Sequence, residues 1–147
     1  MAFSDRFHRQ HEQATATIGE LRHLVRVQRP GADAVAIAVQ LARLFSALRV
    51  HFAEEDACLV RALIETGDGA AAALAARHQE DSGSLAWDWE EYMQRWSSSA
   101  VIALNFAAFA AALERLLGAL EERIRQEEAT LYPVADALFS DLQGKAA

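Results

Sequence analysis

The sequence has little cysteine, little proline and no strand-like pattern, and each shortage narrows what the chain can be. Its single cysteine, Cys58, excludes an internal disulfide and fits a reducing compartment. Only two of the 147 residues are proline, alanine is frequent, and Val, Ile and Thr do not alternate with polar residues, so helix is predicted throughout. The length suits one domain with one core, predicted to span residues 1–147.

Positive charge is scarce as well. The formal net charge of −7 argues against a nucleic acid or an anionic membrane surface as a partner. Residues 1–9 lack the apolar segment of a signal peptide, and no charge-free apolar run approaches ~18 residues, about the length that spans a bilayer. We therefore expect a cytoplasmic protein that binds neither nucleic acid nor membrane.

Apolar residues recur at alternating steps of three and four along four long segments, which is the spacing of one helix face. The predicted helices span about 4–28, 33–66, 70–96 and 100–138. Breaks at Pro30-Gly31, at Gly67 to Gly69 and at Ser97 to Ser99 separate them. Pro133 is expected to kink or end the last helix nearby. Four helices joined by short turns predict an all-α fold, an antiparallel up-down-up-down four-helix bundle.

Polar residues interrupt each apolar face. On the second segment, His51 and Glu55 stand four residues apart in the apolar stripe. An ionised carboxylate that is buried without a partner costs many kcal/mol, so Glu55 requires a cation or a proton. The faces of the other three segments carry further polar residues: His11, His78, and Arg123 with Glu127.

Counting from the turns puts these groups at one level of the bundle. His11 precedes the first turn by about as many residues as His51 follows it, and the second turn sets Glu55 near the level of His78. Three imidazoles and two carboxylates in a dry interior suit iron, manganese or zinc. One inward histidine is more often a hydrogen-bonded core residue, but three at one level with two glutamates favour a metal site.

Neighbouring residues have roles that the sequence leaves open. His8 lies one turn before His11 and is an alternative to it as a ligand. Cys58 lies one turn past Glu55 and could approach the metal, although a small buried thiol is the better interpretation. Four acidic residues flank the apolar faces and are interpreted as solvated: Glu54, Asp56, Glu122 and Glu128.

Together these residues resemble the hemerythrin-like, or HHE cation-binding, family. Shared features are an inward histidine in the first helix (His11), the HFxxEE motif (His51 to Glu55), an early histidine in the third helix (His78) and the xIxxEExxLYP motif (Arg123 to Pro133). The resemblance covers nearly the whole chain. It implies a four-helix bundle with a non-haem di-iron centre that binds or senses O2 or related small molecules. The ligands that it implies by position are His11, His51, Glu55, His78 and Glu127.

Two positions depart from the family pattern. Arg123 stands where the motif has a histidine ligand, and Ser82 stands where oxygen-carrying members have an additional histidine. A guanidinium cannot ligate a cation, but it can pair bidentately with a buried carboxylate. Arg123 is therefore expected to place a fixed positive charge beside Glu127 or Glu55 and to take over the electrostatic role of one iron. The site then holds one metal, an incomplete di-metal centre, or no metal at all.

The function expected from these observations is that of an iron-binding protein whose ligand is a small diatomic molecule or a peroxide, such as O2, NO or hydrogen peroxide. The sequence offers no dedicated catalytic acid, base or nucleophile beyond the metal ligands, so turnover of an organic substrate is not expected. The alternative is a metal-free helical bundle that acts by protein interaction, for example as a homodimer through an exposed face.

Overall fold

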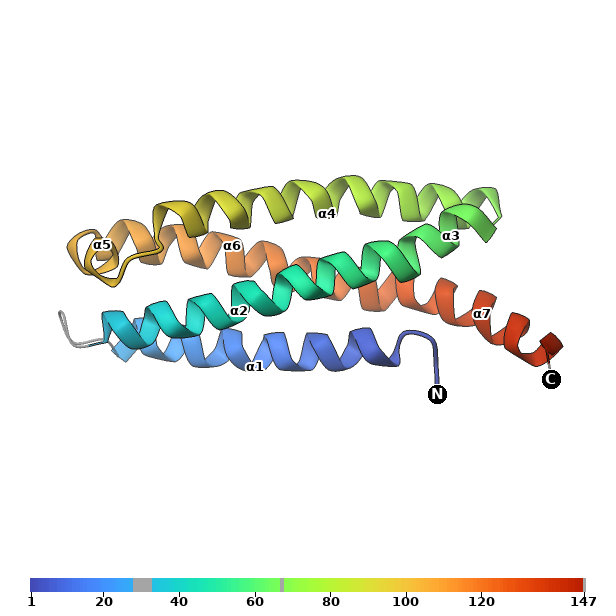
Figure 1. The fold of residues 1–147 in the computed structure, drawn as a ribbon, viewed down its shortest axis with the longest axis horizontal. Helices are drawn as coiled ribbons and strands as arrows, with labels where there is room; N and C mark the ends of the chain where they lie inside the picture. The colour runs from blue at the N-terminus through green and yellow to red at the C-terminus, as the bar shows by residue number, and fades with distance from the viewer. Residues whose placement is uncertain (28–32, 67, 147) are drawn as a thin grey trace.

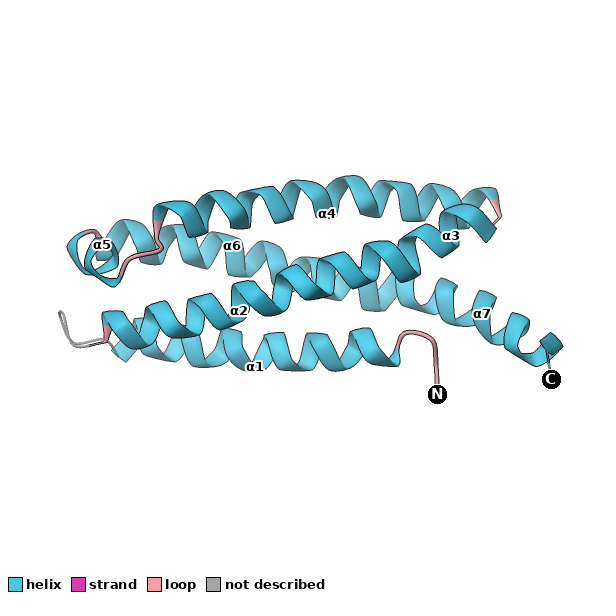
Figure 2. Cartoon of the chain, viewed as in Figure 1, coloured by secondary structure: helices cyan, strands magenta, loops and turns pink. Residues whose placement is uncertain are grey.

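The computed structural model describes residues 1–27, 33–66 and 68–146, with side chains as far as residue 139. Within these ranges the secondary structure is helical and contains no strand. Four helical rods lie side by side along one axis and run alternately in opposite directions (Figure 1). A short loop joins the third rod to the fourth (Figure 2). The predicted all-α, up-down-up-down bundle is confirmed.

The four rods follow the four predicted segments. The first is α1 (Asp5–Val27), and the third is α4 (Gly69–Arg95). The second rod consists of α2 (Ala34–Glu54), the π-helix η1 (Glu55–Val60) and α3 (Arg61–Thr66). The fourth rod consists of α5 (Ser99–Leu104), α6 (Phe106–Gln126), the π-helix η2 (Glu127–Leu131) and α7 (Tyr132–Ala146). The predicted Pro30-Gly31 turn and Gly67 lie outside the described residues.

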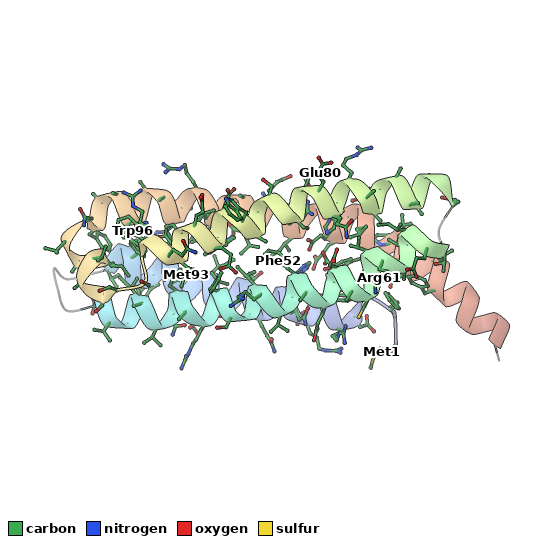
Figure 3. All side chains as sticks on the ribbon, turned by 45° about the horizontal axis from the view of Figure 1, so that its top comes forward. Met1, Phe52, Arg61, Glu80, Met93 and Trp96 are labelled. Carbon is green, nitrogen blue, oxygen red and sulfur yellow. The ribbon has the colours of Figure 1, made fainter. Side chains whose placement is uncertain are left out.

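Side chains fill the space between the rods (Figure 3) and form two apolar clusters. Leu44 and Trp89 belong to the cluster toward α5, whereas Leu63 and Tyr132 belong to the cluster toward α3 and α7. All four are at most 1% exposed. A layer of polar side chains lies between the two clusters. Because apolar packing excludes water on both sides of this layer, charges within it interact strongly.

Both π-helices begin at a buried glutamate, Glu55 in η1 and Glu127 in η2. A π turn closes its hydrogen bonds over five residues instead of four, so the inward positions that follow shift by about one residue. In η1 this shift buries Leu59 and exposes Cys58. The preferred interpretation of Cys58 as a small buried thiol is therefore wrong. Its sulfur lies at the surface, 3.6 Å from Arg6 Nη2.

The predicted fourth helix, 100–138, is interrupted once and continues further than expected. Asn105 separates α5 from α6 and has φ −128° and ψ 40°, outside the helical region. Its side-chain amide donates to the Val101 carbonyl at 3.4 Å, a local hydrogen bond that competes with helix continuation. Pro133 lies in the first turn of α7, where proline is tolerated. The helix continues to Ala146, and α7 leaves the line of α6 (Figure 1).

The helical stretch Ala34–Thr66 differs from expectation in its hydropathy. It contains an 18-residue window of mean hydropathy 1.4, so by length and composition alone it is apolar enough to cross a membrane. The expectation from the sequence was that no apolar run without charges is long enough to span a bilayer. The stretch passes the present test because its apolar residues outweigh charged ones such as Arg43 and Arg49. One face of the stretch packs in the bundle core, where Ile37, Leu41 and Leu44 are at most 1% exposed.

The start of α1 is fixed to α7 by Ser4, which is fully buried. Its backbone N–H and its hydroxyl donate to the two carboxylate oxygens of Asp136, at 2.8 and 2.7 Å.

Replacing Asp136 by Ala leaves both donors without their partner, so we expect the free energy of unfolding to fall by about 1–3 kcal/mol in urea denaturation. Asp88→Ala, at an exposed position on α4, is the control. An equal effect of both substitutions would contradict this account of the anchor.

Candidate metal centre

Six polar side chains from all four rods form the layer between the two apolar clusters. Each is at most 7% exposed, and they are His11 on α1, His51 on α2, Glu55 at the start of η1, His78 on α4, Arg123 on α6 and Glu127 at the start of η2. The five residues expected as ligands therefore lie together. Arg123, expected in place of a ligand, lies among them.

Glu55 and Glu127 lie at the centre of the layer. In each of them the two carboxylate oxygens face opposite sides of the layer. On the first side, His11 Nε2 is 2.7 Å from Glu127 Oε2. His51 Nε2 is 3.4 Å from Glu55 Oε2 and 3.6 Å from Glu127 Oε2. One donor atom from each of these four residues lies within 4.8 Å of the other three. Two imidazole nitrogens and two carboxylate oxygens thus surround one point, which we call the Oε2 side.

The other two oxygens face His78 and Arg123, and we call this the Oε1 side. His78 Nε2 is 2.6 Å from Glu55 Oε1 and 3.4 Å from Glu127 Oε1. Arg123 Nε is 3.2 Å from Glu127 Oε1, so of the two carboxylates that Arg123 was expected to face, it pairs with Glu127. Arg123 also donates to the Ser82 hydroxyl and to the His78 backbone carbonyl. The Ser82 hydroxyl lies 3.2 Å from His78 Nε2.

Polar residues outside the layer orient two of the imidazoles. His51 Nδ1 is 2.8 Å from Gln10 Oε1, and His11 Nδ1 is 2.9 Å from Glu128 Oε1. A histidine that donates through Nδ1 turns the lone pair of its neutral Nε2 the other way, here into the layer. Glu128 was interpreted from the sequence as a solvated residue. Its side chain is partly exposed, but one of its oxygens also contacts the site through His11 Nδ1. His8 lies outside the layer, 3.1 Å from the same Glu128 oxygen.

Tyr132 is a residue of this site that the sequence interpretation missed. Its hydroxyl donates to Glu55 Oε2 at 2.6 Å and lies 3.3 Å from Glu127 Oε2. Burial and the two carboxylate charges raise the pKa of Tyr132, so the hydroxyl keeps its proton. In a regular helix Thr130 would be the next inward position after Glu127, but the π turn exposes Thr130 and points Tyr132 inward. The five-residue spacing Glu127 to Tyr132 is the signal that would have revealed it.

The electrostatics of the layer favour a cation. Burial opposes a charge on His51, but Glu127 and Glu55 outweigh this effect and raise its pKa to about 9. Burial likewise opposes ionisation of Glu55, but His51 and His78 outweigh it and lower the pKa of this carboxyl. Among the described residues, His51 Nε2 on the Oε2 side is buried without a hydrogen-bond partner. Since buried polar atoms are nearly always paired, an imidazole nitrogen left this way between two carboxylates fits a metal ion.

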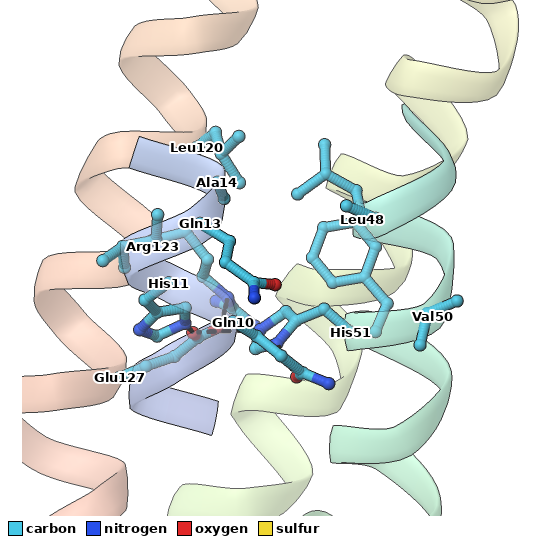
Figure 4. Close-up of a pocket in the computed structure, with 13 residues that line it drawn as sticks. Gln10, His11, Gln13, Ala14, Leu48, Val50, His51, Leu120, Arg123 and Glu127 are labelled. Carbon is cyan, nitrogen blue, oxygen red and sulfur yellow. Dashed lines mark hydrogen bonds and ion pairs between the residues drawn. The ribbon is translucent and has the colours of Figure 1, made fainter. Parts of the chain in front are cut away.

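A cavity of about 200 Å³ leads to the layer between α1, α2 and α6. His11 and His51 approach each other at its floor beside Arg123 and Glu127, and Leu48 and Leu120 stand on opposite walls (Figure 4). The mouth is lined by residues such as Gln13, Ala47 and Val50. The walls are mostly apolar, so the cavity favours small neutral molecules over ions.

A family model described as the hemerythrin HHE cation binding domain matches residues 2–135. The chain belongs to this family. No curated protein and no solved structure gives a significant match. The family match confirms the resemblance found in the sequence, and it covers every residue of the polar layer. The hemerythrin HHE match and the buried His/Glu cluster agree in indicating a cation site.

The pairing of His51 with two carboxylates predicts how the stability of the metal-free protein depends on pH. Because the pKa of His51 is about 9 in the folded protein and 6.5 as its ordinary value, its stabilising charge is present below pH 6.5 and lost as the pH rises to 9. We expect urea denaturation with a chelator present to show a loss on the order of 3 kcal/mol over this range.

A His51→Gln variant carries no charge at this position and is expected to lack most of this pH dependence. His23→Gln, at an exposed histidine of α1, serves as the matched control and is expected to keep it. Equal slopes for His51→Gln and for the unmodified protein would show that the pairing of His51 does not stabilise the fold.

Proposed function

We propose that this hemerythrin HHE protein binds iron at His11, His51, Glu55 and Glu127, and that O2, NO or peroxide binds there; His78, the fifth ligand that the resemblance implies, faces the other two carboxylate oxygens. The observation that carries the proposal is the Oε2 side of the layer, where two imidazole nitrogens and two carboxylate oxygens lie within 4.8 Å of one another. Histidine and carboxylate ligands together suit iron. Bound iron would supply open coordination positions and a change of oxidation state.

The chain itself supplies three further contributions. Gln10 and Glu128 hold His51 and His11 with Nε2 toward the site, at 2.8 and 2.9 Å. The apolar clusters above and below the layer exclude water from these two directions. The apolar cavity beside His11 and His51 gives a small neutral molecule a more favourable route to the site than an ion has.

One observation favours the alternative of a metal-free interaction module. The layer also balances its charge without a metal, because His51 and Arg123 offer two positive charges to the two carboxylates. A bundle closed by such pairs would fold and act without iron. Metal analysis separates the two functions, since only the first requires a bound ion.

Purified protein, loaded with Fe(II) under anaerobic conditions and desalted, is expected to retain iron when measured by mass spectrometry of the metal. His51→Ala and Glu127→Ala remove Oε2-side donors and are expected to weaken iron binding more than ~10-fold, while both variants keep their helical circular dichroism. His23→Ala, outside the site, is expected to bind iron normally. Iron loss in His23→Ala as large as in His51→Ala, or no iron in the unmodified protein, would refute the proposal.

The cavity makes a separate prediction about ligand entry. Ala47 is an exposed residue at the mouth, so Ala47→Trp should narrow the route and slow NO association with the iron-loaded protein several-fold in stopped-flow absorption. The iron content should stay the same. Ala42→Trp, exposed on the same helix and not lining the cavity, should leave the rate unchanged. If both variants associate equally fast, ligands enter by another route.

A further inference from the structure

We propose that the Arg123 guanidinium occupies the position of a second cation in the layer, so that the centre holds a single metal ion on the Oε2 side. This inference rests on the proposed function, because it concerns how many ions the site binds. It follows from the different composition of the two sides of Glu55 and Glu127.

The two sides differ in the nitrogen atoms that they offer. The Oε2 side has two imidazole nitrogens, from His11 and His51, facing the two carboxylate oxygens. The Oε1 side has one, His78 Nε2, facing the other two carboxylate oxygens. The place opposite His78 is taken by Arg123, which carries a fixed charge and no lone pair. Within the described part of the chain, a complete set of four donors is therefore found only on the Oε2 side.

Arg123 is held in place and cannot move aside easily. Its side chain is 7% exposed. Its donors reach the His78 carbonyl and the Ser82 hydroxyl on α4, and its Nε lies 3.2 Å from Glu127 Oε1. Toward the surface, Asp81 lies 3.9 Å from Nη1. Moving the guanidinium would break its contacts with the His78 carbonyl, the Ser82 hydroxyl and Glu127, which is costly in an apolar interior.

The charge of the layer leads to the same conclusion. One divalent ion together with Arg123 exceeds the two carboxylates by a single positive charge, whereas two divalent ions with Arg123 would exceed them by three. Excess charge of one sign in a dry layer is strongly unfavourable. Arg123 therefore disfavours a second ion by occupying its place and by repelling it.

A single iron has a chemical consequence. A single iron that changes between Fe(II) and Fe(III) would supply one electron, so reduction of O2 by two electrons would require a second electron from outside the layer. Binding of NO requires no second metal. Of the small molecules proposed above, NO is therefore the one that the single-metal centre suits best.

The test is the iron content after loading with excess Fe(II) under anaerobic conditions and desalting. We expect about one iron per chain. After oxidation, a single Fe(III) has half-integer spin, so electron paramagnetic resonance is expected to account for about all of the iron. Two irons per chain, or iron that is silent because it is coupled in pairs, would overturn this inference and leave the proposed function intact. No bound iron would refute the proposed function itself.

A variant adds the reverse test. Arg123→His removes the fixed charge and adds an imidazole, so its iron content is expected to rise toward about two per chain. Arg22→His replaces an arginine that pairs with Glu114 and Glu121 away from the layer, and this control is expected to stay at one. A folded Arg123→His protein that still binds one iron would contradict the role of Arg123. Should this variant fail to fold, the iron content and spin of the unmodified protein still decide.

Discussion

Two carboxylates in an apolar interior are the constraint on which the rest of this structure depends. Removing an ionised glutamate from water costs several kcal/mol, which only well-placed partners can offset. Each rod contributes at least one such partner, and the partners are His11, His51, His78, Arg123 and Tyr132. The apolar clusters above and below make this demand stricter by excluding water. The bundle can therefore be regarded as two apolar cores that meet at an electrostatic layer.

The π turns connect this layer to the fold. Each begins at one of the two central glutamates and gives the helix one extra residue there. The extra residue turns Tyr132 inward to donate to Glu55, and it brings Leu59 into the second cluster. Each π turn therefore does two things. It places residues at the site, and it determines which later residues of the same rod face the core.

Much of this arrangement could be predicted from the sequence. The three-four spacing of apolar residues identifies the four rods, and counting from the turns puts His11, His51, Glu55, His78 and Glu127 at one level, because an α-helix has a constant rise. The same constancy explains the errors: a π turn breaks the period, so Cys58 was expected inside and Tyr132 was overlooked. Glu128 was taken for a solvated residue because its contacts to His8 and His11 come from another rod, and no periodicity within one helix reveals them.

The charge pairs of the layer also determine the order in which the protein is assembled. Many small metal-binding domains are unfolded without their ion, because nothing else offsets the burial of their ligands. Here the glutamates have protein partners before any ion arrives, so folding can precede metal binding. An ion that binds would then enter a finished bundle and displace the proton of His51 rather than organise the chain. Its loss would leave a folded protein that can bind an ion again.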